Sequence, residues 1–289
     1  AELMQKAQEA GAANAQDPFF ANVVNTIGYL FGNIGTFLIM VAALKAFKAK
    51  EVFSAPRKAP FAVGGVIGIL ALQGLSIVIQ GVIESVTQMT GVSENMQTMT
   101  TFNGDPKLTA LIFFYFVIVA PVTEELLCRG FVLNALAPID RRFALYASSI
   151  LFGLMHGNFN QIFNGFLLGL LLGYLTLKTG SIFFSIAAHM LANLNAMGMQ
   201  YLFAYKTDNT TAMLIYAAIV SVIGLVCLVI FIKKNGKVNT DTDTVTSYMI
   251  DVPDKKGLTW KAFFTSPAVI AVAVIYIIVA IVNVNSIAG

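Results

Sequence analysis

The sequence predicts an all-α fold, a polytopic bundle of transmembrane helices with about eight spans. Of its 289 residues, 57% are hydrophobic and 11% are charged, whereas about 25% of the residues in a soluble domain are charged. The apolar residues also form long unbroken runs, which excludes the ~10-residue alternating segments of an outer-membrane barrel. They would fill about eight segments of ~20 residues, the length that a helix needs to cross a bilayer.

Each predicted span is bounded by charged residues, proline, glycine or asparagine. The spans cover residues 24–46, 60–86, 108–135, 143–157, 160–178, 181–204, 211–232 and 266–286. We divide the chain accordingly into an extracytoplasmic segment 1–23, two spans with their loop in 24–105, and a four-span core in 106–204. Residues 205–289 supply the last two spans around a polar cytoplasmic loop, 233–263.

Lysine and arginine follow the first, third, fifth and seventh predicted spans, whereas the intervening loops hold few cations. Because cytoplasmic loops carry the excess of cations, this alternation predicts an even number of spans with both termini outside. The formal net charge is +3, and the lysine and arginine residues behind it cluster at helix ends. No nucleic-acid partner is therefore expected. Cys128 and Cys227 lie in apolar stretches and predict no disulfide. The oligomeric state is not indicated.

The fifth span carries Gly165, Gly169 and Gly173 at four-residue spacing. This spacing places the three glycines on one helix face, where another helix can approach closely. The expected role of this face is packing.

Charged residues inside the spans mark the candidate site, because a charge at the centre of a membrane helix costs ~2.5–3.5 kcal/mol on insertion scales. The third span contains Glu124, Glu125 and Arg129. The chain has two histidines, His156 and His189, and both lie in apolar spans. Carboxylates, a guanidinium and imidazoles inside apolar spans predict a functional site where the third, fourth and sixth spans meet.

Helix periodicity separates the two glutamates. Glu125 and Arg129 are four residues apart and share a face, so we expect an ion pair within the helix. Glu124 is turned ~100° away and must face another span or a cavity. His189 and Asn193 share a face and can point to one place in the bundle. Taken singly, each histidine and Asn193 would also suit a packing or helix-linking role.

Three motifs occur in order on consecutive spans: Glu124-Glu125 with Arg129, Phe152 with His156, and His189 with Asn193. Over about residues 106–200 the chain thereby resembles the CAAX protease and bacteriocin-processing family of intramembrane endopeptidases, which includes the Rce1-type and Abi proteins. Cys128 stands where many members have an aromatic residue.

The resemblance implies eight membrane helices and an intramembrane endopeptidase, a hydrolase in which a glutamate and a histidine activate water. We expect the glutamic type, which uses no cofactor. Glu124 would be the general base and His156 would help to position the water. His189 and Asn193 would stabilise the oxyanion, while Glu125, Arg129 and Phe152 would support the site. Such preorganised donors are effective in a site of low dielectric constant.

Three other interpretations stay open. Glu124, His156 and His189 are alternative zinc ligands for a metal-bound hydroxide, although the helical His-Glu-x-x-His signature is absent. Cys128 is an alternative nucleophile beside the first motif. The protein is alternatively a non-proteolytic immunity protein or sensor-kinase partner. Proton-coupled transport is disfavoured, because no matched interrupted helices are visible.

The expected substrate is a hydrophobic or lipidated peptide or protein in contact with the lipid bilayer. For a bacterial member this is a bacteriocin, pheromone or leader peptide, and otherwise a prenylated CAAX protein. We expect an integral protein of a bacterial cell membrane with its site toward the cytoplasmic half. Glu124 lies ~18 Å from the predicted inner end of its span at 1.5 Å per residue.

Overall fold

The computed structural model describes residues 59–90, 104–137, 140–156 and 159–238, together with single positions in 23–42, at 102 and in 265–274. Throughout this part the backbone forms helices and short connections, without a strand. The predicted all-α class is therefore confirmed. The segment 1–23, most of the spans 24–46 and 266–286, and most of the loop 233–263 lie outside the described residues.

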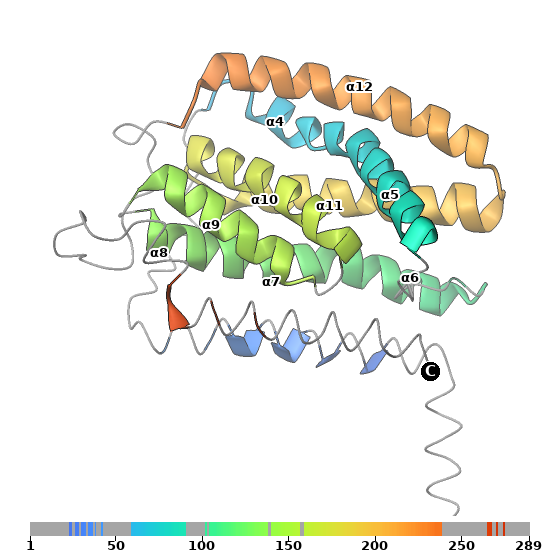
Figure 1. The fold of residues 1–289 in the computed structure, drawn as a ribbon, viewed down its shortest axis with the longest axis horizontal. Helices are drawn as coiled ribbons and strands as arrows, with labels where there is room; N and C mark the ends of the chain where they lie inside the picture. The colour runs from blue at the N-terminus through green and yellow to red at the C-terminus, as the bar shows by residue number, and fades with distance from the viewer. Residues whose placement is uncertain are drawn as a thin grey trace, which may run out of the picture.

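Among the described residues, two helices precede the predicted core, and they are followed by one long helix and four further helices (Figure 1). The first two are α4 (Ala62–Gly68) and α5 (Ala71–Thr90). The long helix runs through α6 (Pro106–Phe114), η1 (Tyr115–Val119), α7 (Ala120–Glu125), η2 (Leu126–Leu133) and α8 (Asn134–Leu136), where η1 and η2 are π-helical. It is followed by α9 (Arg141–Leu154), α10 (Phe159–Thr179), α11 (Ile182–Met199) with its π-helical end η3 (Gln200–Lys206), and α12 (Thr210–Asn235).

Short polar side chains begin four of these helices. Asp105 accepts a hydrogen bond from the backbone N–H of Lys107, and Pro106 occupies the first helical position. Asp140, Ser181 and Asn209 cap α9, α11 and α12 in the same way. Such caps satisfy backbone N–H groups that have no partner inside the helix. The sequence therefore specifies where the spans of the core begin.

Within the described residues, five helical stretches are long and apolar enough to cross a membrane, so the protein is an integral membrane protein. They are Ala62–Ile83, Pro106–Leu136, Gln161–Thr179, Ile182–Lys206 and Thr210–Asn235. The predicted span 143–157 is not among these stretches. It is the 14-residue helix α9, which at 1.5 Å per residue is about 21 Å long and too short for a ~30 Å hydrocarbon core. Figure 1 shows α9 ending well before the end of the bundle at which α6 begins.

The glycine face of α10 packs against α9, as the spacing predicts. A Cβ atom at Gly169 would lie 2.9 Å from Cα of Ser149, and one at Gly165 would lie 3.1 Å from Cα of Gly153. A Cβ atom at Gly173 would meet the Leu145 side chain at 2.5 Å. The two backbones approach so closely only because these positions lack side chains.

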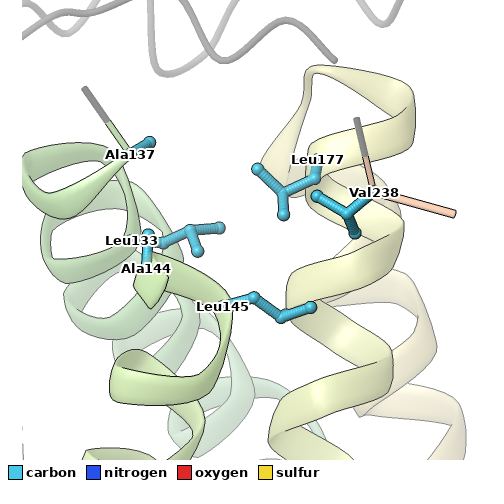
Figure 2. Packing of buried hydrophobic residues seen from close by; sticks show 6 residues of the cluster. All are labelled: Leu133, Ala137, Ala144, Leu145, Leu177 and Val238. Carbon is cyan, nitrogen blue, oxygen red and sulfur yellow. The ribbon is translucent and has the colours of Figure 1, made fainter. Parts of the chain in front are cut away.

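Residues 236–238, after α12, tie this helix to the α9–α10 pair. Their three carbonyl oxygens accept hydrogen bonds from the side chains of Tyr174, Lys178 and Arg142, in that order. Val238 is buried in a hydrophobic cluster (Figure 2), whose other members are Leu133, Ala137, Ala144, Leu145 and Leu177. This end of the bundle is thus closed by both apolar packing and backbone hydrogen bonds.

We expect Gly169→Ala to destabilise the protein, because the added methyl group would push α9 away from α10. Overpacking of this kind costs about 1–3 kcal/mol. The measurement is the melting temperature of the purified protein in detergent. Gly81→Ala is the matched control, since a Cβ atom there would meet nothing within 4 Å, and it should melt at or above the wild-type temperature. A Gly169→Ala protein as stable as the control would contradict the close packing.

Candidate active site

The predicted site residues come from five segments of the core. They are Glu124 and Glu125 at the end of α7, Arg129 in η2, Phe152 in α9, His156 in the turn after α9, and His189 and Asn193 in α11.

The expected ion pair is present at the centre of the site. Nη1 of Arg129 donates to Oε1 of Glu125 at 2.8 Å, and both side chains are fully buried. Nη2 of Arg129 donates to the backbone carbonyl of Gly169 at 2.9 Å. The guanidinium also lies over the Phe152 ring, 4.4 Å from its centroid. Arg129 thereby links the long helix to both α9 and α10.

His189 lies between the two glutamates. Its Nδ1 is 3.1 Å from Oε1 of Glu125, and its Nε2 is 3.9 Å from Oε2 of Glu124. Because a carboxylate paired with arginine can only accept hydrogen bonds, Nδ1 of His189 must carry the proton of this contact. In the neutral ring Nε2 is then an acceptor, and it faces Glu124.

The two glutamates have different surroundings. Glu125 is fully buried and bound by Arg129 and His189, whereas the Glu124 side chain keeps 18% of its surface exposed. Neighbouring helix positions point about 100° apart, which explains why one carboxylate enters the ion pair and the other does not. Glu124 is therefore the more accessible carboxylate of the pair.

Phe152 separates the two histidines. Its buried ring makes edge contacts with His156 and His189, at centroid distances of 5.1 and 5.5 Å. Nδ1 of His156 is 2.9 Å from the carbonyl oxygen of Phe152. Since a carbonyl oxygen only accepts, Nδ1 is the donor and Nε2 of the neutral ring is unprotonated. One aromatic side chain thus sets the position of both imidazoles.

Asn193 has a backbone partner that the sequence did not indicate. Its Nδ2 donates to the carbonyl oxygen of Phe116 at 2.8 Å, within the π-helical stretch Tyr115–Val119. In a π-helical turn this carbonyl would accept from the N–H five residues later, and that residue is Pro121, which has none. The amide of Asn193 therefore satisfies an oxygen left open by proline, and it retains a second N–H.

Sequence reasoning missed Gly169 and Asn134. Gly169 contributes its carbonyl to Arg129, and no side-chain pattern signals a backbone ligand. Asn134 is buried and donates from Nδ2 to the carbonyls of Arg129 and Gly130, at 2.8 and 3.2 Å. An amide within an apolar span was the available signal, because polar side chains are costly there.

The three alternative zinc ligands do not form a cluster among the described residues. Among the described residues, no three histidine, cysteine, aspartate or glutamate side chains gather closely enough to hold a metal ion. Glu125 is occupied by Arg129 and His189. Glu124, His156 and His189 are therefore not arranged as a ligand set here.

Cys128 is buried rather than presented as a nucleophile. It is 1% exposed and packs with Leu127, Phe152 and Leu168, and its sulfur lies 3.5 Å from that of Met155. Its surroundings are those of a core residue.

Arg129→Met should cost about 3–5 kcal/mol of stability, because it leaves the Glu125 carboxylate buried without its cation. The double variant Glu125→Leu/Arg129→Met should recover part of this loss, since it removes the buried charge as well. Melting temperatures in one detergent provide the comparison. If the double variant melts below Arg129→Met, the assigned ion-pair energetics are wrong.

The comparisons with known proteins fall on the same part of the chain. A family model described as type II CAAX prenyl endopeptidase Rce1-like matches residues 106–195, which include all seven predicted site residues. No curated protein and no solved structure was found to match the chain. The matched family is one of proteases, so the match indicates a hydrolase. The resemblance drawn from the three motifs is confirmed, because residues 106–195 match the model of the Rce1-like CAAX protease family.

Proposed function

We propose that this protein is a glutamic-type intramembrane endopeptidase in which Glu124 activates water for hydrolysis of a peptide bond. The observation that carries the proposal is the difference between the two glutamates. Glu125 is fully buried and ion-paired, whereas Glu124 is partly exposed and faces His189. The family match supports the CAAX type of protease.

The spacing of Glu124 and His189 suits a shared water molecule. Oε2 of Glu124 and Nε2 of His189 are 3.9 Å apart, which is too long for a direct hydrogen bond. A water molecule between two such groups lies within hydrogen-bonding distance of both. A carboxylate that accepts the proton of this water acts as a general base, which contributes about 10²–10⁴ in rate. His156 lies across the Phe152 ring and would help to orient the same water.

His189 has a second role once the tetrahedral intermediate forms. Because Nδ1 is already engaged by Glu125, Nε2 donates to an oxyanion only when the ring carries both protons. The carboxylates of Glu124 and Glu125 lie on either side of this ring. The second N–H of Asn193 would provide another donor. Removing one such donor elsewhere costs about 10²–10³ in kcat.

Charge distribution favours a site in the cytoplasmic half of the bilayer. Figure 1 shows α8, the start of α9 and the end of α12 at one end of the bundle. Together with Asp140, this end carries Arg141, Arg142, Lys178, Lys233, Lys234 and Lys237. At the opposite helix ends Lys107 and Lys206 are matched by Asp105 and Asp208. By the positive-inside rule, the cation-rich end faces the cytoplasm.

We propose a hydrophobic or lipidated peptide as the substrate. The description of the matched family names a prenyl CAAX endopeptidase, so a prenylated CAAX peptide is the first substrate to test. A bacteriocin, pheromone or leader peptide is the second, appropriate to a bacterial cell membrane. Both substrates would reach the site from the membrane, because the site lies within the spans.

Glu124→Gln, His156→Ala and His189→Ala should each reduce cleavage of a fluorogenic prenylated CAAX peptide by at least about 10²-fold. Each variant should still insert into the membrane and fold. Asp208→Asn is the control, because this acidic residue lies at the opposite end of the bundle and should keep wild-type activity. Full activity of Glu124→Gln would refute the mechanism. If the wild type cleaves a leader peptide but not the prenylated peptide, only the substrate class changes.

Removal of metal should leave the activity unchanged, because the mechanism uses the carboxylate and imidazoles of the chain. Purified protein is treated with a chelator, freed of metal by dialysis and assayed with and without added zinc. Loss of activity on chelation, followed by recovery with zinc, would replace the glutamic mechanism with the zinc-dependent alternative.

A further inference from the structure

Asn134 is a buried polar residue that none of the three motifs contains. Its side chain is 3% exposed in an apolar span. Its Nδ2 donates to the carbonyls of Arg129 and Gly130, while its backbone N–H donates to that of Phe131. One residue thereby contacts three successive carbonyl groups of the turn that carries Arg129.

This turn belongs to the π-helical stretch Leu126–Leu133. π-Helical turns are rare and are found frequently at functional sites. In a membrane, backbone groups of such a turn need partners from the protein itself. Asn134 provides a side-chain donor at the point where the long helix returns to α-helical form.

The direction of the Arg129 side chain depends on this turn. Its guanidinium is planar and must reach Oε1 of Glu125 and the carbonyl of Gly169 at once, at 2.8 and 2.9 Å. A small rotation of the Arg129 backbone would lengthen one contact or the other. Oε1 of Glu125 in turn accepts a hydrogen bond from Nδ1 of His189. The geometry therefore leads from Asn134, through Arg129 and Glu125, to the imidazole that faces Glu124.

We propose that Asn134 is a positioning residue of the active site, which acts by holding the Arg129 turn and so fixes His189 relative to Glu124. This inference rests on the proposed function for its kinetic consequence. Its structural consequence, energetic coupling between Asn134 and Arg129, holds for any activity.

The chain offers a matched control in Asn235. Its Nδ2 also donates to the carbonyl four residues earlier, that of Phe231 at 2.9 Å, and to a second carbonyl, that of Pro60 at 2.8 Å. It lies at the end of α12 and belongs to none of the contacts around Arg129. Asn235→Ala therefore removes a similar pair of hydrogen bonds without touching the site.

The kinetic experiment compares Asn134→Ala with Asn235→Ala on the prenylated CAAX peptide. Asn134→Ala should lower kcat at least tenfold and leave KM within twofold, because the bond-breaking geometry changes and the substrate surface does not. Asn235→Ala should keep the wild-type kcat. A wild-type kcat for Asn134→Ala, or an equal loss in both variants, would overturn the inference.

The second experiment needs no substrate. Asn134→Ala should lower the melting temperature of the wild type at least twice as much as that of an Arg129→Met protein. In the Arg129→Met protein, the turn that Asn134 holds no longer carries a guanidinium. Asn235→Ala should cause the same shift in both backgrounds. Equal shifts for Asn134→Ala in the two backgrounds would refute the coupling. If Asn134 and Arg129 are coupled but the wild-type protein cleaves no peptide, the proposed function has failed and the positioning role has not.

Discussion

The ion pair between Glu125 and Arg129 is the interaction on which the core of this structure depends. Both side chains are fully buried, and transfer of a single charge into such a medium costs several kcal/mol unless partners compensate. The compensation comes from every neighbouring helix of the site: a carbonyl of α10, the Phe152 ring of α9 and the His189 ring of α11. Contacts with one guanidinium and one carboxylate thus fix these helices relative to one another.

The same pair also gives the two glutamates different surroundings. Oε1 of Glu125 accepts hydrogen bonds from both Arg129 and His189, and the whole side chain is buried. Its neighbour Glu124 lacks these contacts and keeps part of its surface exposed. Two adjacent residues of one type therefore acquire different surroundings from the helix geometry.

Much of the site was accessible from the sequence because its members are costly residues in apolar spans. Glu124, Glu125, Arg129 and His189 were identified by this criterion, and the 3.6-residue period correctly separated the two glutamates. The shortness of α9 was not predicted, since an apolar run of 143–157 shows hydrophobicity and not where a helix ends. The π-helical stretches and the partner of Asn193 were also missed, because hydropathy and spacing carry no information on backbone hydrogen bonds.

Two of the π-helical stretches, η1 and η2, lie next to the site residues, and polar side chains donate to carbonyls in and beside them. Thr123 donates to the carbonyls of Val119 and Ala120 beside Pro121, and Asn193 donates to that of Phe116. Asn134 does the same beyond Arg129. In a bilayer, such irregular backbone persists only where protein groups or a water-filled cavity satisfy it. The short helix α9 obeys the same constraint, because it ends at Leu154 and places the His156 turn at membrane depth. There the ring of His156 contacts the carbonyl oxygen of Phe152 through Nδ1, so a polar side chain also serves the backbone at the end of this helix.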